Sequence, residues 1–330
     1  MKIIRAGGNL GFYFSSGFRL LAFSLALFSL TGCGPKYTYP SDTVTQSVEN
    51  ILLKEEKLEV EAQVAGKTLG AVLYMDALVD PQGQVPKEVH DNMGKVMQAV
   101  TRVALSTDLA IEYCVVVVRD LKQGNELIVT RSVDDTKRAN ADAMGVEESI
   151  NRTVFSQSHY QPPAAGKPKF KLEEVTLEGF LADQITQRIR FNFAKDVKDA
   201  PENPLVLADG SVHESPDGSR HFYFSMIGFK SKDSKSNILG MLNIVNDVFG
   251  GYQFSGYATV ELRDYLNRQK LVVERKILED YRKKKITEQE ILDRYLTESQ
   301  SVQEAFKLFG FNLPAEQAGP PQEAQTEPAK

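Results

Sequence analysis

The stretch Val96–Asp120, VMQAVTRVALSTDLAIEYCVVVVRD, joins a helical pattern to a buried strand. Apolar residues recur at spacings of three and four up to Ala104, which is typical of one buried face of an α-helix. The run Ala110–Val118 is then almost entirely apolar, which indicates a buried strand. A second strand is predicted upstream at Thr68–Met75, and Pro86 stands at a favoured first position for the helix. Strand, helix and strand in this order are typical of a helix packed across a sheet.

The residues before this unit predict one more helix and one more strand. Ser41 or Asp42 can cap a helix that carries Val44, Val48 and Ile51 on one face. Alternation from Leu58 to Val64 then predicts a half-buried strand, and Gly66-Lys67 suits a tight turn into Thr68–Met75.

The same pattern recurs later in the chain. A shift of 144 residues aligns Val96–Arg131 with Gly240–Arg275 without a gap, and Glu148–Arg152 also resembles Glu290–Arg294. The aligned segments share eight identities: Met97/Met241, Tyr113/Tyr257, Val116/Val260, Arg119/Arg263, Asp120/Asp264, Leu127/Leu271, Val129/Val273 and Arg131/Arg275. We expect two related halves, because a stacked solenoid needs three or more shorter units. Each segment should form a helix followed by a strand, with Met97 and Met241 facing inward.

The alignment leaves the state of Glu126–Val133 open. Its β-branched residues favour a strand, whereas Leu266, Val273, Ile277 and Tyr281 in the aligned copy have helical spacing. We favour a helix in both copies. Further predictions, in chain order, are helices within Asp135–Ala143 and Val146–Phe155, a helix capped by Thr176, a polar loop at Asp199–Ser219, a strand at His221–Phe229, a helix within Asn237–Phe249 and an extended Tyr252–Val260.

These elements predict an α+β fold, with a mixed or antiparallel sheet flanked by helices, two related halves and a helical C-terminal tail. The tail has three apolar stripes: Val273, Ile277 and Tyr281; Ile291, Leu292, Tyr295 and Leu296; and Val302, Ala305, Phe306 and Phe309. The expected organisation is a signal peptide at 1–32, a tether at 33–43, a first half at 44–158, a linker at 159–169, a second half at 170–263, the helical tail at 264–310 and a disordered end at 311–330.

The N-terminus has the layout of a secretory signal. Lys2, Arg5 and Arg19 precede the apolar run Leu20–Leu30, and no acidic residue occurs before Asp42. An uncleaved membrane helix would need about 20 apolar residues, and Arg19 and Pro35 leave only about 15. The ending Leu30-Thr31-Gly32-Cys33 resembles the lipobox of bacterial lipoproteins.

That resemblance implies that Cys33 is the lipidation site, diacylated on sulfur with chains such as palmitate, and that the signal is cut before it. It also implies an envelope location, with the chain bound to a membrane through its lipid. Gly34 stands where an aspartate tends to retain such proteins in the inner membrane, so the outer membrane facing the periplasm is favoured if the organism has one.

Composition and motifs give no catalytic centre. The chain has a net charge of −5, and loss of the signal removes only positive charges, so no nucleic-acid partner is expected. With Cys33 acylated, Cys114 has no disulfide partner and is expected to be a thiol in the core. Glycine-rich phosphate loops, nucleophile elbows and zinc motifs do not occur in the sequence. We therefore assign no catalytic residue, no metal ligand and no cofactor.

Two groups of residues are weaker candidates for chemistry. Asp209, His213, Glu214, Asp217 and His221 have the side chains of a metal site, but the glycines and prolines among them suit an ordinary turn without a tightly held ion. Arg119-Asp120 and Arg263-Asp264 lie at expected strand ends, where a structural salt bridge is the simpler interpretation.

The segment Ile277–Leu296 resembles the short helical-hairpin modules called SHOCT domains, through Ile286-Thr287 and Glu290-Ile291. That family is thought to mediate assembly, although Lys285 replaces its usual glycine. Independently, Thr287 and Glu290 have the spacing of a capping box, which predicts the start of a helix.

The sequence thus predicts a membrane-anchored envelope lipoprotein that is a non-catalytic binding or assembly component. Whether its partner is another protein of the envelope is left open by the sequence. The alternative is an envelope hydrolase or metal-dependent enzyme that uses the Asp209–His221 segment.

Overall fold

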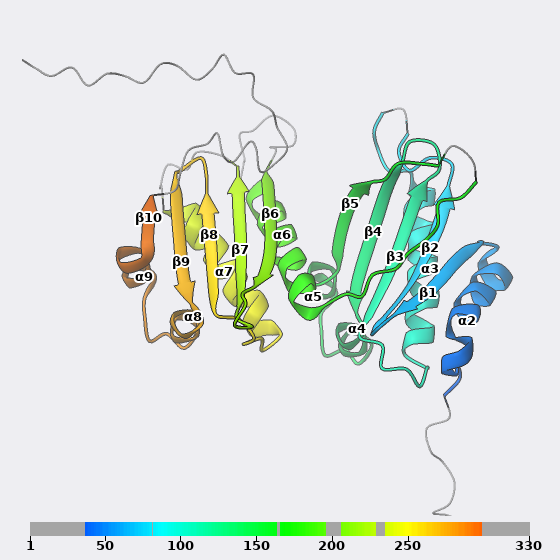
Figure 1. Ribbon diagram of the computed structural model, residues 1–330, viewed down its shortest axis with the longest axis horizontal. Coiled ribbons are helices and arrows are strands. Elements are labelled where there is room, and N and C mark those ends of the chain that lie inside the picture. Colours follow the sequence, from blue (N-terminus) through cyan, green and yellow to red (C-terminus); the bar gives the residue numbers. More distant parts are fainter. Residues whose placement is uncertain (1–36, 81, 164–165, 196–205, 229–234, 299–330) are drawn as a thin grey trace, which may run out of the picture.

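The computed structural model describes residues 37–80, 82–163, 166–195, 206–228 and 235–298. These residues form two five-stranded mixed sheets that lie side by side with helices packed on them, which confirms the α+β class (Figure 1). Cys33, the lipidation site expected from the sequence, and the third apolar stripe of the tail lie outside the described residues.

The first sheet has the strand order β1-β2-β3-β4-β5. Its strands are β1 (Val60–Ala65), β2 (Thr68–Met75), β3 (Tyr113–Asp120), β4 (Asn125–Ser132) and β5 (Val154–His159). The helical elements are η1 (Ser41–Thr43), α2 (Val44–Ile51), η2 (Leu52–Glu56), α3 (Lys87–Ala104), α4 (Val133–Asn140) and α5 (Val146–Asn151). β2 and β3 are parallel and connected through α3, whereas the other neighbours are antiparallel.

The second sheet has the order β10-β9-β8-β7-β6. Its strands are β6 (Leu207–Glu214), β7 (Arg220–Ile227), β8 (Thr259–Asp264), β9 (Gln269–Glu274) and β10 (Leu296–Glu298). Its helices are α6 (Leu177–Lys195), α7 (Ser236–Gly251), α8 (Arg275–Arg282) and α9 (Glu288–Tyr295). Here too the parallel pair, β7 and β8, is connected through a helix, α7, and the other pairs are antiparallel.

The two sheets also share the register of one strand pair. Val116 of β3 pairs with Val129 of β4, and Val260 of β8 pairs with Val273 of β9. Each residue of the second pair lies 144 positions after its counterpart in the first pair. Each aligned segment forms a helix followed by a strand, and Met97 and Met241 are both buried. Residues that correspond under this shift therefore occupy equivalent places in the two halves.

The cores explain why the central strands are apolar. In β3, Cys114, Val116 and Val118 belong to the core beneath α2 and α3, while Val115 and Val117 belong to a separate cluster with Phe170 and Leu172. A strand covered on both faces needs apolar residues at every position. The second core is centred on an aromatic group of Phe222, Phe249, Phe254 and Tyr257.

The segment around Phe170, assigned from sequence to the second half, instead packs on the first sheet. The side-chain amide of Gln63 donates to the carbonyl oxygen of Phe170 at 2.8 Å and accepts from the backbone N–H of Leu172 at 3.0 Å. The first half therefore extends through the expected linker as far as Val175, whose N–H donates to Thr68 Oγ1 at 2.8 Å.

The helical prediction for Glu126–Val133 and its copy was wrong, because both are strands. β4 and β9 each pair antiparallel along the strand before them, and their β-branched residues suit that half-buried position. The residues with helical spacing between Leu266 and Tyr281 do not share one helix, because β9 ends at Glu274 and α8 starts at Arg275. Residues 264–298 thus complete the second sheet and are not a separate helical tail.

Cys114 is a free, buried thiol, as the sequence predicts. Burial raises the pKa of this thiol to about 12, which keeps it protonated and unreactive at neutral pH. Among the described residues, no helix combines the length and apolar character needed to cross a membrane.

Candidate functional site: the junction between the two sheets

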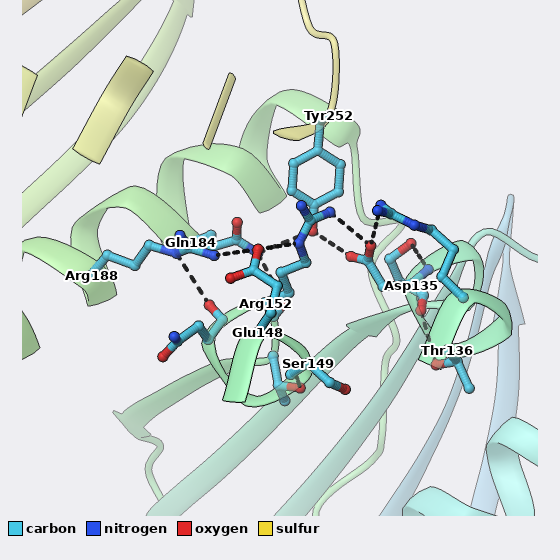
Figure 2. A network of polar contacts seen from close by, with 12 residues as sticks. Asp135, Thr136, Glu148, Ser149, Arg152, Gln184, Arg188 and Tyr252 are labelled. Atoms are coloured by element: carbon cyan, nitrogen blue, oxygen red, sulfur yellow. Dashed lines mark hydrogen bonds and ion pairs between the residues drawn. The ribbon is translucent and has the colours of Figure 1, made fainter. Parts of the chain in front are cut away.

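A group of polar side chains, with Asp135, Arg152 and Gln184 buried at its centre, joins the two halves (Figure 2). Asp135 lies in the first turn of α4, where the Ser132 hydroxyl caps the helix by accepting from the Asp135 N–H. Arg152 follows the last residue of α5, and the second half contributes Gln184 from α6 and Tyr252 from the end of α7. We call Asp135, Glu148, Arg152, Gln184 and Tyr252 the junction network.

Arg152 is the centre of this network. Its guanidinium donates to Asp135 Oδ1 at 3.0 Å and to Glu148 Oε1 at 2.6 Å, and it lies over the ring of Tyr252 at 4.6 Å. The side chains of Arg152 and Asp135 are only 7% and 5% exposed. A buried charge is tolerated only when it is paired, so each partner here depends on the other.

Gln184 and Tyr252 connect the second half to these charges. The Tyr252 hydroxyl donates to Asp135 Oδ2, and Gln184 Nε2 donates to the carbonyl oxygen of Arg152 at 2.9 Å and to the Tyr252 hydroxyl at 3.1 Å. The backbone of Gly251 is also close, because a Cβ at that position would lie 2.7 Å from Arg152 Nη2. A side chain at position 251 would therefore displace the Arg152 guanidinium from its present position.

A second set of bonds covers the edge of β5. Gln187 of α6 accepts from the N–H of Phe155 at 2.7 Å and donates to the carbonyl oxygen of Thr153 at 2.8 Å. An uncovered edge strand is a template for unwanted pairing, and α6 satisfies part of this one. The two halves thus make direct polar contacts through both α5 and β5.

The network shifts the acidity of its members. Burial alone would raise the pKa of Glu148, but hydrogen bonds and charges from Arg152 and Arg188 outweigh it and hold the pKa below its usual value. Burial, and then the charge of Asp135, raise the pKa of the Tyr252 phenol. At neutral pH Glu148 is therefore ionised and Tyr252 is a neutral donor.

The depressed pKa of Glu148 predicts an acid-dependent contribution to stability. This contribution is present above the usual carboxyl pKa of 4.5, and it is lost as the pH falls through the lower pKa that Glu148 has in the folded protein. We expect the free energy of unfolding of the wild type to exceed that of Glu148→Gln at pH 7, with the difference shrinking below about pH 4. Urea unfolding at a series of pH values measures this, and a difference that is independent of pH would contradict it.

A cleft with a volume of about 770 Å³ opens beside the network. Both halves line it, the first mainly through Glu112, Asp134, Lys137 and Arg138, and the second through Leu177 and Gln253. Its charged side chains are of both signs, so the cleft suits a polar partner without a strong preference for one charge.

The segment Asp209–His221 does not form the polar loop expected from the sequence. It forms most of β6 and the turn into β7, in which His213 pairs with His221 across the hairpin. The ring of His213 hydrogen-bonds Ser211 Oγ at 3.1 Å, and His221 Nδ1 hydrogen-bonds Thr259 Oγ1 at 2.8 Å. Within the described ranges, no three histidine, cysteine or acidic side chains are grouped so as to hold a metal ion.

The Arg-Asp pairs at the strand ends have structural roles. Arg119 forms an ion pair with Glu126, and Arg263 with Glu261 at 2.5 Å. Asp120 accepts from the N–H groups of Lys122 and Gln123 at 2.7 and 2.8 Å, which closes the turn into β4. Asp264 likewise accepts from the N–H and side-chain amide of Asn267 at 3.2 and 2.6 Å, in the turn before β9.

The capping box predicted at Thr287 is present. Thr287 Oγ1 accepts from the Glu290 N–H at 3.3 Å, and Glu290 Oε2 accepts from the Thr287 N–H at 2.8 Å. The junction residues carry no sequence motif of a functional site, although Glu148–Arg152 aligns with Glu290–Arg294. Both of those segments hold an i,i+4 ion pair, at 2.6 and 3.9 Å.

Comparison with known proteins gives no family. No protein-family model and no curated protein matches the chain. Among solved structures, the sex pheromone staph-cAM373 precursor matches 72% of this chain and 79% of its own, at 11% identity and a TM-score of 0.20. A sex pheromone precursor from Lactobacillus salivarius matches 66% of this chain and 62% of its own, at 12% identity and a TM-score of 0.16. At these scores neither likeness supports an argument about this chain.

Proposed function

We propose that this chain is a lipid-anchored protein of the bacterial envelope and a non-catalytic binding or assembly component. The anchor would be Cys33, on the strength of the charged, apolar and small-residue order that ends there. Two or three acyl chains give stable attachment, where one would be marginal.

The start of the fold supports a short distance between anchor and body. The N–H groups of Thr38 and Tyr39 donate to the carbonyl oxygen of Ser106 at 3.0 and 3.1 Å, and Tyr39 bridges to Thr107. Thr38 is five residue steps from Cys33, which span at most about 17 Å when extended. The first sheet would therefore lie next to the membrane surface.

The junction network is the observation that carries the non-catalytic interpretation. Its buried charges are bonded to one another and to the backbone of both halves, and the strand-end aspartates are bonded to turns. These groups fix two sheets into one body with constant surfaces. Such a body is suited to holding a partner rather than to transferring protons.

Replacing Cys33 with serine tests the anchor. The wild type should fractionate entirely with membranes and have an intact mass that fits a lipidated terminus at Cys33, whereas Cys33→Ser should lose that modification and its cleavage. Cys114→Ser is the matched control and should stay lipidated. An unmodified wild type that starts at Met1 would contradict the proposal.

A metal assay of the purified protein tests the absence of metal-dependent chemistry. Stoichiometric zinc or manganese that is lost in the His213→Ala and His221→Ala variants would contradict a non-catalytic role and restore the enzyme alternative.

A further inference from the structure

The first half contains an open groove of about 670 Å³ between α3 and the strands β4 and β5. Its apolar lining includes Met93, Met97, Leu105, Val129 and Phe155. The ring of Phe155 is 44% exposed, and a Cβ added to Gly94 would meet no atom within 4 Å. The groove thus has unoccupied space beside apolar side chains.

The equivalent place in the second half is filled. Under the shift of 144, Gly94, Met97 and Val129 correspond to Ile238, Met241 and Val273, and these three are fully buried. They share one core with Leu278 of α8 and with Ile291 and Leu292 of α9. The short helices α8 and α9 thus contribute to the core in which this surface of the second half is buried.

The first half has the corresponding helices, and its α4 lines the groove through Thr136 and Asn140, but α5 does not cover it. α5 buries none of its residues, and Val146 and Ile150 are 78% and 58% exposed. The ion pairs of Glu148 and Arg152 hold the end of α5 against α4 and α6 instead. Formation of the junction network thus leaves the groove without its own covering helix.

The chain has one further apolar stripe, which lies outside the described residues. Val302, Ala305, Phe306 and Phe309 recur at the spacing of one helical face, and Gly310 follows at a favoured stop. The first two stripes of the tail are occupied, because Val273 of the first stripe and Ile291 and Leu292 of the second belong to the second core. A helix this short is marginal alone in water and needs a surface on which to pack.

We infer that the groove of the first half receives the segment Val302–Phe309 of a second copy of this chain. Among the described residues no acidic side chain lines the groove, whose ionisable residues are His90, Arg102 and Arg131, and the segment itself carries one acid and one base, Glu304 and Lys307. The inference gives the assembly role proposed above a specific partner.

The segment cannot reach the groove of its own chain. From Glu298 to Val302 the chain spans at most about 14 Å. β10 is the strand of the second sheet farthest from β6, so four strand spacings of about 4.8 Å, or roughly 19 Å, separate those edges. α6 and the first sheet lie beyond β6 (Figure 1). Docking therefore has to occur between two copies.

Sedimentation equilibrium of the mature chain with Cys33→Ser tests the inference. This variant has no acyl chain, so the result does not depend on whether Cys33 is lipidated. We expect concentration-dependent self-association that Phe306→Asp weakens about 10- to 100-fold, since one buried phenylalanine is lost. Phe155→Asp in the groove should weaken it by a similar factor. Phe191→Asp is the matched control, because Phe191 is 51% exposed on α6 and does not line the groove.

Thiol cross-linking identifies the contact itself. One population carries Met93→Cys and the other Phe306→Cys, and we expect cross-linked pairs only when the two are mixed. A chain that is monomeric at every concentration, or self-association that Phe306→Asp does not change, would overturn the inference. Cross-linking within a single chain that carries both cysteines would overturn it as well. Because the acyl chain is absent, each of these failures leaves the anchor proposal standing.

Discussion

Replacing Arg152 with methionine is expected to lower the free energy of unfolding by about 3–5 kcal/mol. The change removes the charge that pairs with Asp135 while keeping much of the side-chain volume. The Asp135 side chain is 5% exposed and would keep a buried charge whose remaining ion pair, with the more exposed Arg138, is longer, at 3.6 Å. Urea unfolding followed by circular dichroism measures the loss.

Arg138→Met is the matched control for that variant. Arg138 also pairs with Asp135, at 3.6 Å, but its side chain is 41% exposed, so its removal should cost about 1 kcal/mol or less. The double variant Asp135→Asn, Arg152→Met should recover part of the loss, because neither charge is then left alone. Equal effects of Arg152→Met and Arg138→Met would show that the junction does not depend on the buried pair.

Leu292→Ala is expected to lower the free energy of unfolding by about 2–5 kcal/mol. Leu292 is 4% exposed and lies in the core of the second half together with Leu278 and Ile291. Truncation before Thr287, which removes α9 and β10 altogether, should lower the melting temperature still further. Differential scanning calorimetry of the mature chain with Cys33→Ser measures both.

The control for Leu292 is its counterpart in the first half. Ile150 occupies the same place relative to the Glu148–Arg152 pair as Leu292 does relative to Glu290–Arg294, yet it is 58% exposed. Ile150→Ala should therefore change stability by no more than about 0.5 kcal/mol. A melting temperature that stays unchanged after truncation before Thr287 would mean that α9 does not pack on the second sheet.

The local sequence pattern was sufficient to predict a helix or strand where one face of that element is buried. The strand Thr68–Met75, the helix after Pro86 and the capping box at Thr287 were all predicted from the sequence and are present. In each, spacing and end residues favour the same structure as the tertiary packing does. The helix-then-strand order of both aligned segments could be predicted for the same reason.

Gly210 shows how one residue type can indicate the wrong structure. Asp209-Gly210 has the composition of a turn, but Gly210 lies within β6, where a Cβ would be 2.1 Å from Thr186 Oγ1 of α6. The glycine permits a helix to pack close to a strand. The turn itself is at Gly218, whose φ of +80° favours glycine.

The junction could not be predicted from a single sequence. Asp135 and Tyr252 are 117 residues apart, and neither has a neighbour whose spacing indicates the other. Only the i,i+4 pair of Glu148 and Arg152 is local, and such a pair is common on exposed helices. Pairing between distant polar residues depends on how the two sheets are placed, which local pattern does not determine.

The contiguity of each sheet has a consequence for the order of folding. The first sheet and the segment that covers it end at Val175, so all of their residues are synthesised before β6 begins at Leu207. Domains generally fold as units, and contacts of large sequence separation form late. The bond between Tyr252 and Asp135 can form only once both sheets exist. The stability lost in Arg152→Met should therefore appear as faster unfolding, with little change in the rate of folding.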